Sequence, residues 1–422
     1  MDSNTTAAPP QCCYIIPSHM LKAIAHSQAA SKDSRFIANK TLNHIAKVHS
    51  TRIEAIAKIA EGLPHPQPQG IVPSHIFQAI LDSLSASDHA KDQAKNHLAS
   101  MGALKAAKTS HGEGKPASSA MHLFRLLYDS QQTNREPGTQ LFIEGHVPAD
   151  ADANAKQVYD NFGSTFKFYS EVFSRNSIDN NGMNLIGSVH FDDDNGETEG
   201  YDNAFWDGTE MCFGDGDPLI FNNFTESLDI TGHELTHGVT EKTANLWYEY
   251  QSGALNESIS DVFGSMIKQY ANNQKAKDAD WLIGEGLFRD PEGARALRDM
   301  ANPGTAYTNN KYIGSDPQPK DMDGYVDLPN TPDGDSGGVH INSGIPNRAF
   351  YLAATGVGEY SWDPAGKIWY AALTDPALKL PKTTTKRTFK IFADLTIKHA
   401  QEIGGSAAVD AVTKAWKIVK VL

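Results

Sequence analysis

The spacing of apolar residues in the first half of the chain predicts strands around a single long helix. Apolar runs that alternate or are rich in aromatic residues occur at 121–128 and 185–191, as is typical of β-strands. Between them, residues 153–173 carry apolar side chains at helical spacing, so a helix is expected there. We therefore interpret 122–227 as a mainly β region with one helix.

The rest of the chain has helical patterns. A central helix is expected from about residue 227, and apolar residues recur at helical spacing over 388–400 and 407–421. The last two segments have the pattern of a helical bundle. Residues 228–422 are therefore predicted to be helical, which makes the fold class α+β.

A repeat precedes these regions. Residues 15–24 (IIPSHMLKAI) match residues 71–80 (IVPSHIFQAI), and each copy is followed by a polar, Ala-rich stretch and a second helical pattern. Pro then Ser before apolar residues at helical spacing predicts a turn into a short amphipathic helix. Helices of this size bury little surface alone, so each copy needs a partner surface. The first copy is assigned to residues 1–60 and the second to residues 61–108.

Composition excludes several classes of protein. The 422 residues are 40 % hydrophobic and 21 % charged, as in a globular protein of two or three domains. The net charge of −14 argues against a nucleic-acid partner. Since no stretch of 18 apolar residues occurs, no membrane partner is expected. A monomer is expected.

The N-terminus and the cysteines bear on localisation. The first residues lack a basic region followed by an apolar one, so no secretory signal is predicted. Cys12, Cys13 and Cys212 are the only cysteines, and two adjacent ones are poorly placed to form a bridge. A reducing compartment is consistent with this. We expect a cytoplasmic protein, or one secreted by a non-standard route.

The segment 232–237 (GHELTH) contains the pattern H-E-x-x-H. On a helix His233 and His237 are one turn apart and point the same way, so both imidazoles can reach one metal ion. Glu234 then lies beside the metal as a base. In a chain with 16 histidines the motif alone is a hypothesis, whose alternative is a surface helix with two solvated histidines.

A second pair of residues supports the metal site. Glu257 and Asp261 are four residues apart within an apolar, helical stretch, so they share one helical face. Glu257 supplies the third ligand, and Asp261 accepts the free N–H of a ligating histidine, which orients the ring. The alternative, a solvent-facing charge pair, is weakened by the apolar neighbours of both residues.

In these motifs the chain resembles the thermolysin family of zinc metallopeptidases, from about residue 122 to the C-terminus. The resemblance implies a two-lobe fold, with a β-rich N-terminal lobe, a helical C-terminal lobe and the zinc helix between them. It also implies one zinc ion, held by His233, His237 and Glu257, with Glu234 as the catalytic base.

Further site residues follow from the resemblance. In 203–208 (NAFWDG), Asn203, Ala204 and Trp206 match the edge strand that binds an extended substrate. Arg298 matches the arginine that binds a substrate carbonyl. The residue after the scissile bond is expected in an apolar pocket. Its lining would be Phe221, Phe224, Ile230, Ile283, Leu287 and Leu297.

Two residues match the family's oxyanion-stabilising groups. Tyr248, eleven residues after His237, corresponds to the transition-state tyrosine. His340, in 337–344 (GGVHINSG), corresponds to the histidine that faces the zinc, and Asp335 to the carboxylate that orients and charges it.

The chain departs from the family's pattern at the positions that bind calcium. Candidate calcium ligands remain at Asp229, Asp280 and Glu285, but Lys268 and Leu282 replace two family acids. An ammonium at Lys268 disfavours a second divalent ion nearby. At most one calcium ion is therefore expected.

The repeat resembles the short propeptide of protealysin-like members of the family. By its position before the catalytic region, the second copy is the one expected to act as propeptide, and the first is an additional duplicate. The alternative is a pair of surface helical hairpins with no regulatory role. His19 and His75 are expected to be exposed capping residues rather than zinc ligands.

The polar segment 109–121, rich in Gly, Ser and Pro, is expected to be a protease-sensitive linker, and maturation is predicted within 103–121. The whole chain is then a latent zinc endopeptidase that cleaves proteins or peptides before bulky hydrophobic residues, with its own propeptide as a partner in cis. Two alternatives are a zinc aminopeptidase and a catalytically silent interaction module.

Overall fold

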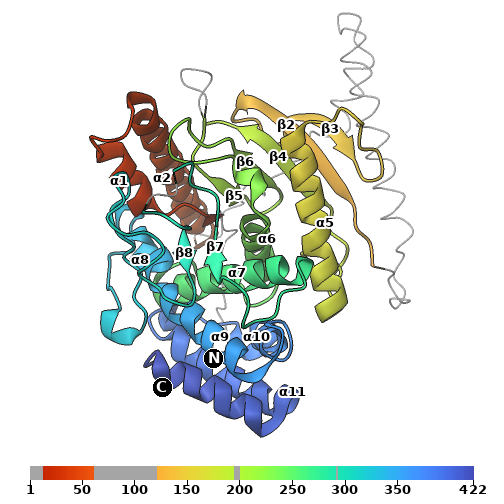
Figure 1. The fold of residues 1–422 in the computed structure, drawn as a ribbon, viewed down its shortest axis with the longest axis vertical. Helices are drawn as coiled ribbons and strands as arrows, with labels where there is room; N and C mark the ends of the chain where they lie inside the picture. The colour runs from red at the N-terminus through yellow and green to blue at the C-terminus, as the bar shows by residue number, and fades with distance from the viewer. Residues whose placement is uncertain (1–12, 61–120, 194–199, 291–292) are drawn as a thin grey trace, which may run out of the picture. The chain divides into compact units, whose positions relative to one another are not determined.

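A computed structural model describes residues 13–60, 121–193, 200–290 and 293–422 (Figure 1). The contacts divide the chain into two units, one formed by 1–56 with 121–422 and the other by 57–120. The first unit contains everything described below. The second copy of the repeat, 61–108, and residues 109–120 of the predicted linker lie outside the described residues.

The first unit contains a mixed six-stranded sheet with the strand order β1-β5-β6-β4-β2-β3. β4 runs parallel to both β2 and β6, whereas β1, β3 and β5 pair antiparallel with their neighbours. The strands span Cys13–Tyr14 (β1), Arg125–Thr133 (β2), Thr139–Ile143 (β3), Leu185–Phe191 (β4), Ala204–Trp206 (β5) and Met211–Gly214 (β6). β2 begins four residues later than the predicted strand because its pairing with β3 and β4 starts only there.

Helix α5 (Ala153–Phe173) packs on β2 and β4 of this sheet and on α6, the helix of the H-E-x-x-H motif. Asp152 accepts a hydrogen bond from the N–H of Ala155 and thereby caps the helix start. Val158 and Phe162 are fully buried. A Cβ on Gly187 of β4 would lie 3.0 Å from both side chains, so a glycine is needed for this close approach.

Helices α6 to α11 form the second lobe (Figure 1). α7 contacts α6, α8, α9 and α11. The predicted helices at 388–400 and 407–421 are one element, α11, with a kink at Gly405, where φ is 64°. The helices span Leu228–Lys242 (α6), Tyr250–Ala271 (α7), Asp335–Asn342 (α8), Gly344–Val357 (α9), Ala365–Thr374 (α10) and Thr388–Ile418 (α11).

Shorter elements connect the long ones. Strands β7 (Leu282–Ile283) and β8 (Arg298–Asp299) pair antiparallel after α7. Single 3-10 turns lie at Phe224–Glu226, Met322–Gly324, Pro332–Gly334, Pro376–Leu378 and Lys382–Thr384.

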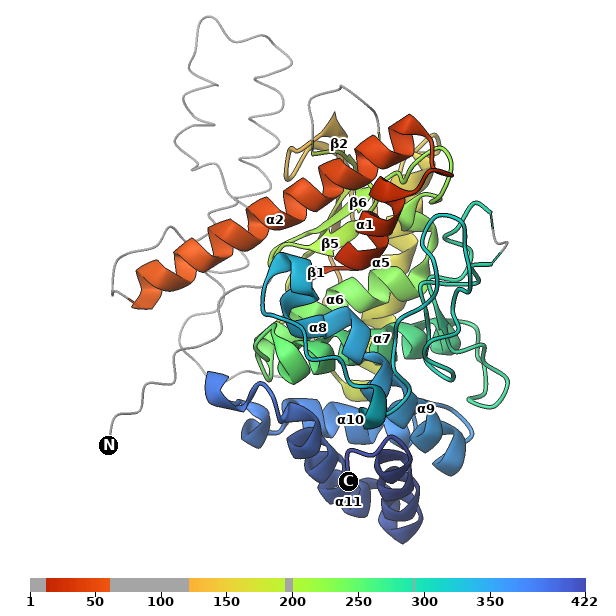
Figure 2. The same ribbon diagram turned by 90° about the vertical axis from the view of Figure 1, so that its left-hand side faces the viewer.

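The first copy of the repeat forms β1, α1 (Ser18–His26) and α2 (Lys32–Ala60), which lie against the sheet edge (Figure 2). β1 pairs with β5, so this N-terminal segment supplies the edge strand of the catalytic sheet. Ile15, Ile16, Leu21 and Ile24 are fully buried and belong to the main hydrophobic core. The partner surface that a short amphipathic helix requires is therefore the catalytic lobe itself.

Candidate metal centre and cleft

The close crossing of α6 and α7 brings three candidate metal ligands together. A Cβ on Gly232 would lie 3.2 Å from the Cα of Gly264, and one on Gly264 would lie 2.5 Å from a carbonyl of α6, so side chains are excluded at this crossing. His233 and His237 on α6 and Glu257 on α7 then converge, with one donor atom of each within 4.8 Å of the others.

The geometry of these donor atoms suits a metal ion. The Nε2 atoms of His233 and His237 are 3.0 Å apart, and each lies 3.4 Å from an oxygen of Glu257. All three side chains are buried. Two imidazole nitrogens and one carboxylate oxygen are the donor set of a catalytic zinc site that keeps one position open.

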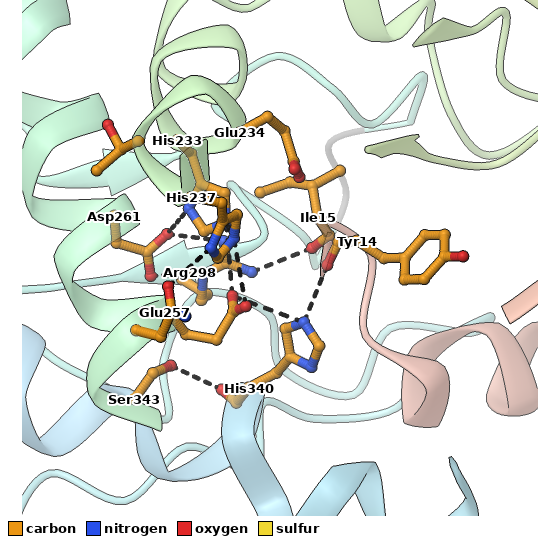
Figure 3. Close-up of polar contacts among 12 residues, drawn as sticks. Tyr14, Ile15, His233, Glu234, His237, Glu257, Asp261, Arg298, His340 and Ser343 are labelled. Carbon is orange, nitrogen blue, oxygen red and sulfur yellow. Dashed lines mark hydrogen bonds and ion pairs between the residues drawn. The ribbon is translucent and has the colours of Figure 1, made fainter. Parts of the chain in front are cut away.

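Neighbouring groups fix the tautomer of both histidines. Nδ1 of His233 donates to Asp261 at 2.8 Å (Figure 3). Nδ1 of His237 donates to Asn256 at 2.9 Å, so the Nε2 lone pair of each ring is left for a metal. Asn256 carries no recognisable motif, and sequence reasoning gave it no role. Its adjacency to Glu257 on the same helix was the available signal.

Asp261 is held by two further residues. Arg298 binds its carboxylate in a bidentate manner at 2.7 and 2.8 Å, and Asn347 donates to it at 2.8 Å. Burial raises the pKa of Asp261, but the charge of Arg298 and the hydrogen bond from His233 outweigh it and hold the pKa at about 2. Asp261 therefore stays ionised beside the metal centre.

Glu234 is fully buried next to the ligands. Its Oε2 accepts the backbone N–H of Trp206 at 3.1 Å, and among the described residues Oε1 has no hydrogen-bond partner. Burial, with a contribution from Glu257, raises the pKa of Glu234 to about 8. An unpaired, buried carboxylate oxygen beside a metal site has the placement of a general base that receives a proton from water.

Tyr248 and His340 both lie next to the carboxylate of Glu257. Nε2 of His340 is 3.6 Å from the Glu257 carboxylate and 3.3 Å from the Tyr248 hydroxyl, which donates to Glu257. Asp335 accepts from Nδ1 of His340 at 2.6 Å and from its backbone N–H at 2.9 Å. Although burial lowers the pKa of His340, the charges of Asp335 and Glu257 raise it to about 9.

A left-handed turn makes the pairing of Asp335 with His340 possible. Residues 335–338 have φ values between 51° and 89°. A Cβ on Gly337 would lie 2.5 Å from the ring of Tyr250, so only glycine fits. The two glycines therefore fold the start of α8 back so that Asp335 reaches the ring of His340.

The N-terminal segment lies across this centre. The carbonyl of Tyr14 accepts from Nε2 of His340 at 2.9 Å, and the carbonyl of Ile15 accepts from Arg298 at 3.2 Å (Figure 3). The N–H of Ile15 donates to the backbone carbonyl of Ala204 at 3.2 Å.

One residue further on, Asn203 holds both polar groups of Ile16. Its Oδ1 accepts the N–H of Ile16 at 2.9 Å, and its Nδ2 donates to the Ile16 carbonyl at 3.4 Å. The groups that sequence reasoning assigned to substrate binding thus contact the chain's own backbone.

The structure places the first copy of the repeat in the cleft, whereas the second was the expected occupant. Residues 71–80 lie outside the described residues. The two copies share the motif, so the sequence held no signal for choosing between them. The expectation of an exposed capping residue at His19 is wrong: its ring is partly buried, with Nε2 3.2 Å from the Tyr307 hydroxyl.

Helix α2 adds buried polar contacts to the same docking. Lys40 forms an ion pair with Asp192 at 2.5 Å, with 6 % and 1 % of the side chains exposed. Nδ1 of His44 is 2.8 Å from the Tyr201 hydroxyl. Burial lowers the pKa of His44 to about 4, so the ring is neutral in the docked state.

The candidate calcium ligands surround an ammonium. Nζ of Lys268 lies 3.4 Å from Asp229, 3.2 Å from Asp280 and 3.4 Å from Glu285. Burial lowers the pKa of Lys268, but the three carboxylates outweigh it and raise the pKa. The ammonium therefore sits where a cation shared by these acids would lie.

A sheet lobe, a helical lobe and a His-His-Glu centre between them define a zinc-dependent peptidase, and comparison with known proteins gives its family. Residues 91–241 match the model of the thermolysin metallopeptidase catalytic domain, and residues 244–421 match that of its α-helical domain. The chain belongs to the thermolysin family of metallopeptidases. It is a protealysin-like zinc metalloendopeptidase with a propeptide.

Three similar proteins illustrate the relationship. An extracellular metalloprotease of Pectobacterium carotovorum is 44 % identical over 83 % of this chain and 96 % of its own length. Protease PrtS of a Photorhabdus strain is 42 % identical over 83 % of this chain and 91 % of its own. The structure of the protealysin precursor from Serratia proteamaculans is 41 % identical, with a TM-score of 0.65, and covers 83 % of this chain and 99 % of its own.

The family also decides between the functions considered from the sequence. Its members are endopeptidases, so neither the aminopeptidase nor the catalytically silent module is supported. Among the described residues, no helix is long and apolar enough to cross a membrane.

Proposed function

We propose that His233, His237 and Glu257 hold the zinc ion and that Glu234 is the general base. A bound zinc polarises the scissile carbonyl and lowers the pKa of water. Glu234 takes a proton from the attacking water and delivers it to the leaving amine. Its unpaired, buried Oε1 supports this role.

Tyr248 and His340 stabilise the negative charge that develops on the scissile carbonyl oxygen. Asp335 keeps the His340 imidazole protonated and oriented. Asn203, Ala204, Trp206 and Arg298 hold an extended substrate through its main chain. The observation that carries this assignment is the N-terminal segment, whose backbone meets these groups in one continuous stretch.

The specificity proposal rests on the lining of the pocket beside Arg298. Its six predicted residues are apolar and at most 2 % exposed. A desolvated apolar pocket favours Leu, Phe or Ile over a smaller residue by about 1–3 kcal/mol. Cleavage is therefore expected before bulky hydrophobic residues.

We propose that the first copy keeps the precursor latent in cis, and that maturation within 103–121 releases it from the catalytic part. The domain limits that we propose are the ones expected from the sequence alone: repeats at 1–60 and 61–108, a linker at 109–121, and lobes at 122–227 and 228–422. Fully active enzyme that keeps residues 1–100 covalently attached would contradict this.

We also propose that the enzyme acts as a monomer and binds at most one calcium ion. Lys268 competes with an ion for Asp229, Asp280 and Glu285. Since a similar protein is named an extracellular metalloprotease, secretion is favoured over the cytoplasm.

The test of the catalytic assignment is Glu234→Gln, compared with Glu241→Gln on the same helix. After nicking within 103–121, the first variant should bind zinc and unfold at the temperature of the unchanged protein, but cleave casein on the order of 10²–10⁴-fold more slowly. Glu241→Gln should retain activity. Near-normal cleavage of casein by Glu234→Gln would refute the base assignment.

A further inference from the structure

Two groups of the cleft bracket a single peptide bond of the N-terminal segment. The carbonyl of Tyr14 accepts from His340, and the N–H of Ile15 donates to the carbonyl of Ala204. These two atoms belong to the same peptide group. The bond between them therefore lies between the histidine proposed to stabilise the oxyanion and the Ala204 carbonyl proposed to hold the main chain of a substrate.

The segment also runs in one defined register beyond this bond. β1 is antiparallel to β5, with Tyr14 opposite Phe205. The next carbonyl, that of Ile15, is bound by Arg298, and Asn203 binds Ile16 on both sides. Each backbone group from the Tyr14 carbonyl to the Ile16 carbonyl thus meets a group to which we assign catalysis or substrate binding.

The side chains agree with this register. The Tyr14 ring points away from the candidate ligands (Figure 3) and packs against Phe205 and His44. Ile15 is fully buried, and its carbonyl is bound by Arg298, the residue that follows Leu297 of the predicted apolar pocket. A bulky apolar residue after the bracketed bond is what that pocket prefers.

The base, Glu234 on α6, is held by the same strand. Trp206, two residues after Ala204 in β5, donates its backbone N–H to one oxygen of Glu234, and the other oxygen is the buried, unpaired one. β5 therefore positions both the acceptor for the Ile15 N–H and the carboxylate that would deliver a proton to it.

We propose that the Tyr14–Ile15 bond is a cleavage site for the chain's own metal centre, an inference that rests on the proposed function. Water adds to the Tyr14 carbonyl carbon, a C–O bond forms, and the C–N bond to Ile15 breaks. One water proton passes through Glu234 to the Ile15 nitrogen, and the second passes to it from the hydroxyl of the new carboxyl group. The products are a carboxylate at Tyr14 and an ammonium at Ile15.

The repeat provides an internal control. Aligning the two copies places Gly70–Ile71 where Tyr14–Ile15 stands in the first. If the second copy occupied the cleft in the same register, the cut would fall at Gly70–Ile71. The position of the cut therefore reports which copy occupies the cleft.

The experiment follows the purified full chain, with zinc added, by intact mass and N-terminal sequencing over time. A chain that begins at Ile15 should accumulate at a rate independent of protein concentration, and none should form in Glu234→Gln. Ile15→Gly should slow this cut by about 10- to 200-fold, whereas Ile71→Gly, the same change in the second copy, should not.

A second readout needs no zinc. In metal-free Glu234→Gln, the amides of Ile15 and Ile16 should both exchange slowly with solvent. Asn203→Ala should expose the amide of Ile16 and leave that of Ile15 protected by Ala204. Rapid exchange of both amides in Glu234→Gln would overturn the register.

Other outcomes are equally decisive. An intact Tyr14–Ile15 bond in zinc-loaded chain that cleaves casein after nicking would overturn the inference and leave the proposed function standing. Loss of casein cleavage as well would overturn the proposed function. A cut only at Gly70–Ile71, or a cut at Tyr14–Ile15 in Glu234→Gln, would also refute self-cleavage at this bond.

Discussion

The buried ion pair between Lys40 and Asp192 makes the docking of the first copy measurable. Lys40 comes from α2 and Asp192 from the end of β4, and both side chains are almost completely buried. Replacing Lys40 by Met removes the ammonium and leaves the Asp192 carboxylate buried. Breaking a buried pair in this way costs about 3–5 kcal/mol.

This cost falls on the docked state alone, because Asp192 regains water when α2 leaves the catalytic lobe. The docking equilibrium should therefore weaken by at least about 100-fold, since every 1.4 kcal/mol is a factor of ten. Lys32→Met is the matched control, because Lys32 is exposed on the same helix and its loss changes the net charge equally.

The assay is amide hydrogen exchange at Ile15 and Ile16 in the Glu234→Gln background, which prevents self-cleavage. Exchange of these amides requires the segment to leave Ala204 and Asn203, so the protection factor reports the free energy of opening. Lys40→Met should reduce protection by at least about 100-fold relative to Lys32→Met. Equal protection in the two variants would refute the reasoning.

Three further predictions concern single residues. Because docking lowers the pKa of His44 from 6.5 to about 4, His44 should weaken docking as pH falls below about 6.5, by about 2 kcal/mol at pH 5, and His44→Gln should remove this part of the pH dependence in the exchange assay. The part that comes from His19, whose pKa burial also lowers to about 4, should stay. Replacing Lys268 by Glu should make thermal unfolding calcium-dependent, so that calcium raises the Tm of the variant more than that of the unchanged protein. An equal rise in Tm in the two proteins would contradict this. Asp261→Ala should reduce zinc affinity about 10- to 100-fold in a chelator competition, because Asp261 orients the ring of His233. Unchanged zinc affinity would show that Asp261 has no such role.

Much of the metal centre was predictable because its signals are local. His233 and His237 lie on one helix and Glu257 and Asp261 on another, each pair four residues apart, and that spacing alone puts each pair on one face. The crossing that joins the two faces depends on glycines at the helix contact. A helical pattern does not show which glycines meet.

Other features had no local signal. β1 has only two residues and forms by pairing with the free edge of β5. A strand this short has no hydrophobic periodicity from which it could be predicted. Lys40 and Asp192 are 152 residues apart in sequence. Asn256 and Asn347 contact their partners only through the tertiary fold, and no motif in the sequence marks either residue.

The zinc ion is the centre of the account, and diffraction data collected on either side of the zinc absorption edge test it most directly. Crystals of the full chain should show one anomalous peak, about 2.0–2.2 Å from Nε2 of His233, Nε2 of His237 and a carboxylate oxygen of Glu257. A peak at another place in the molecule, or none between these three side chains in protein that cleaves casein, would contradict it.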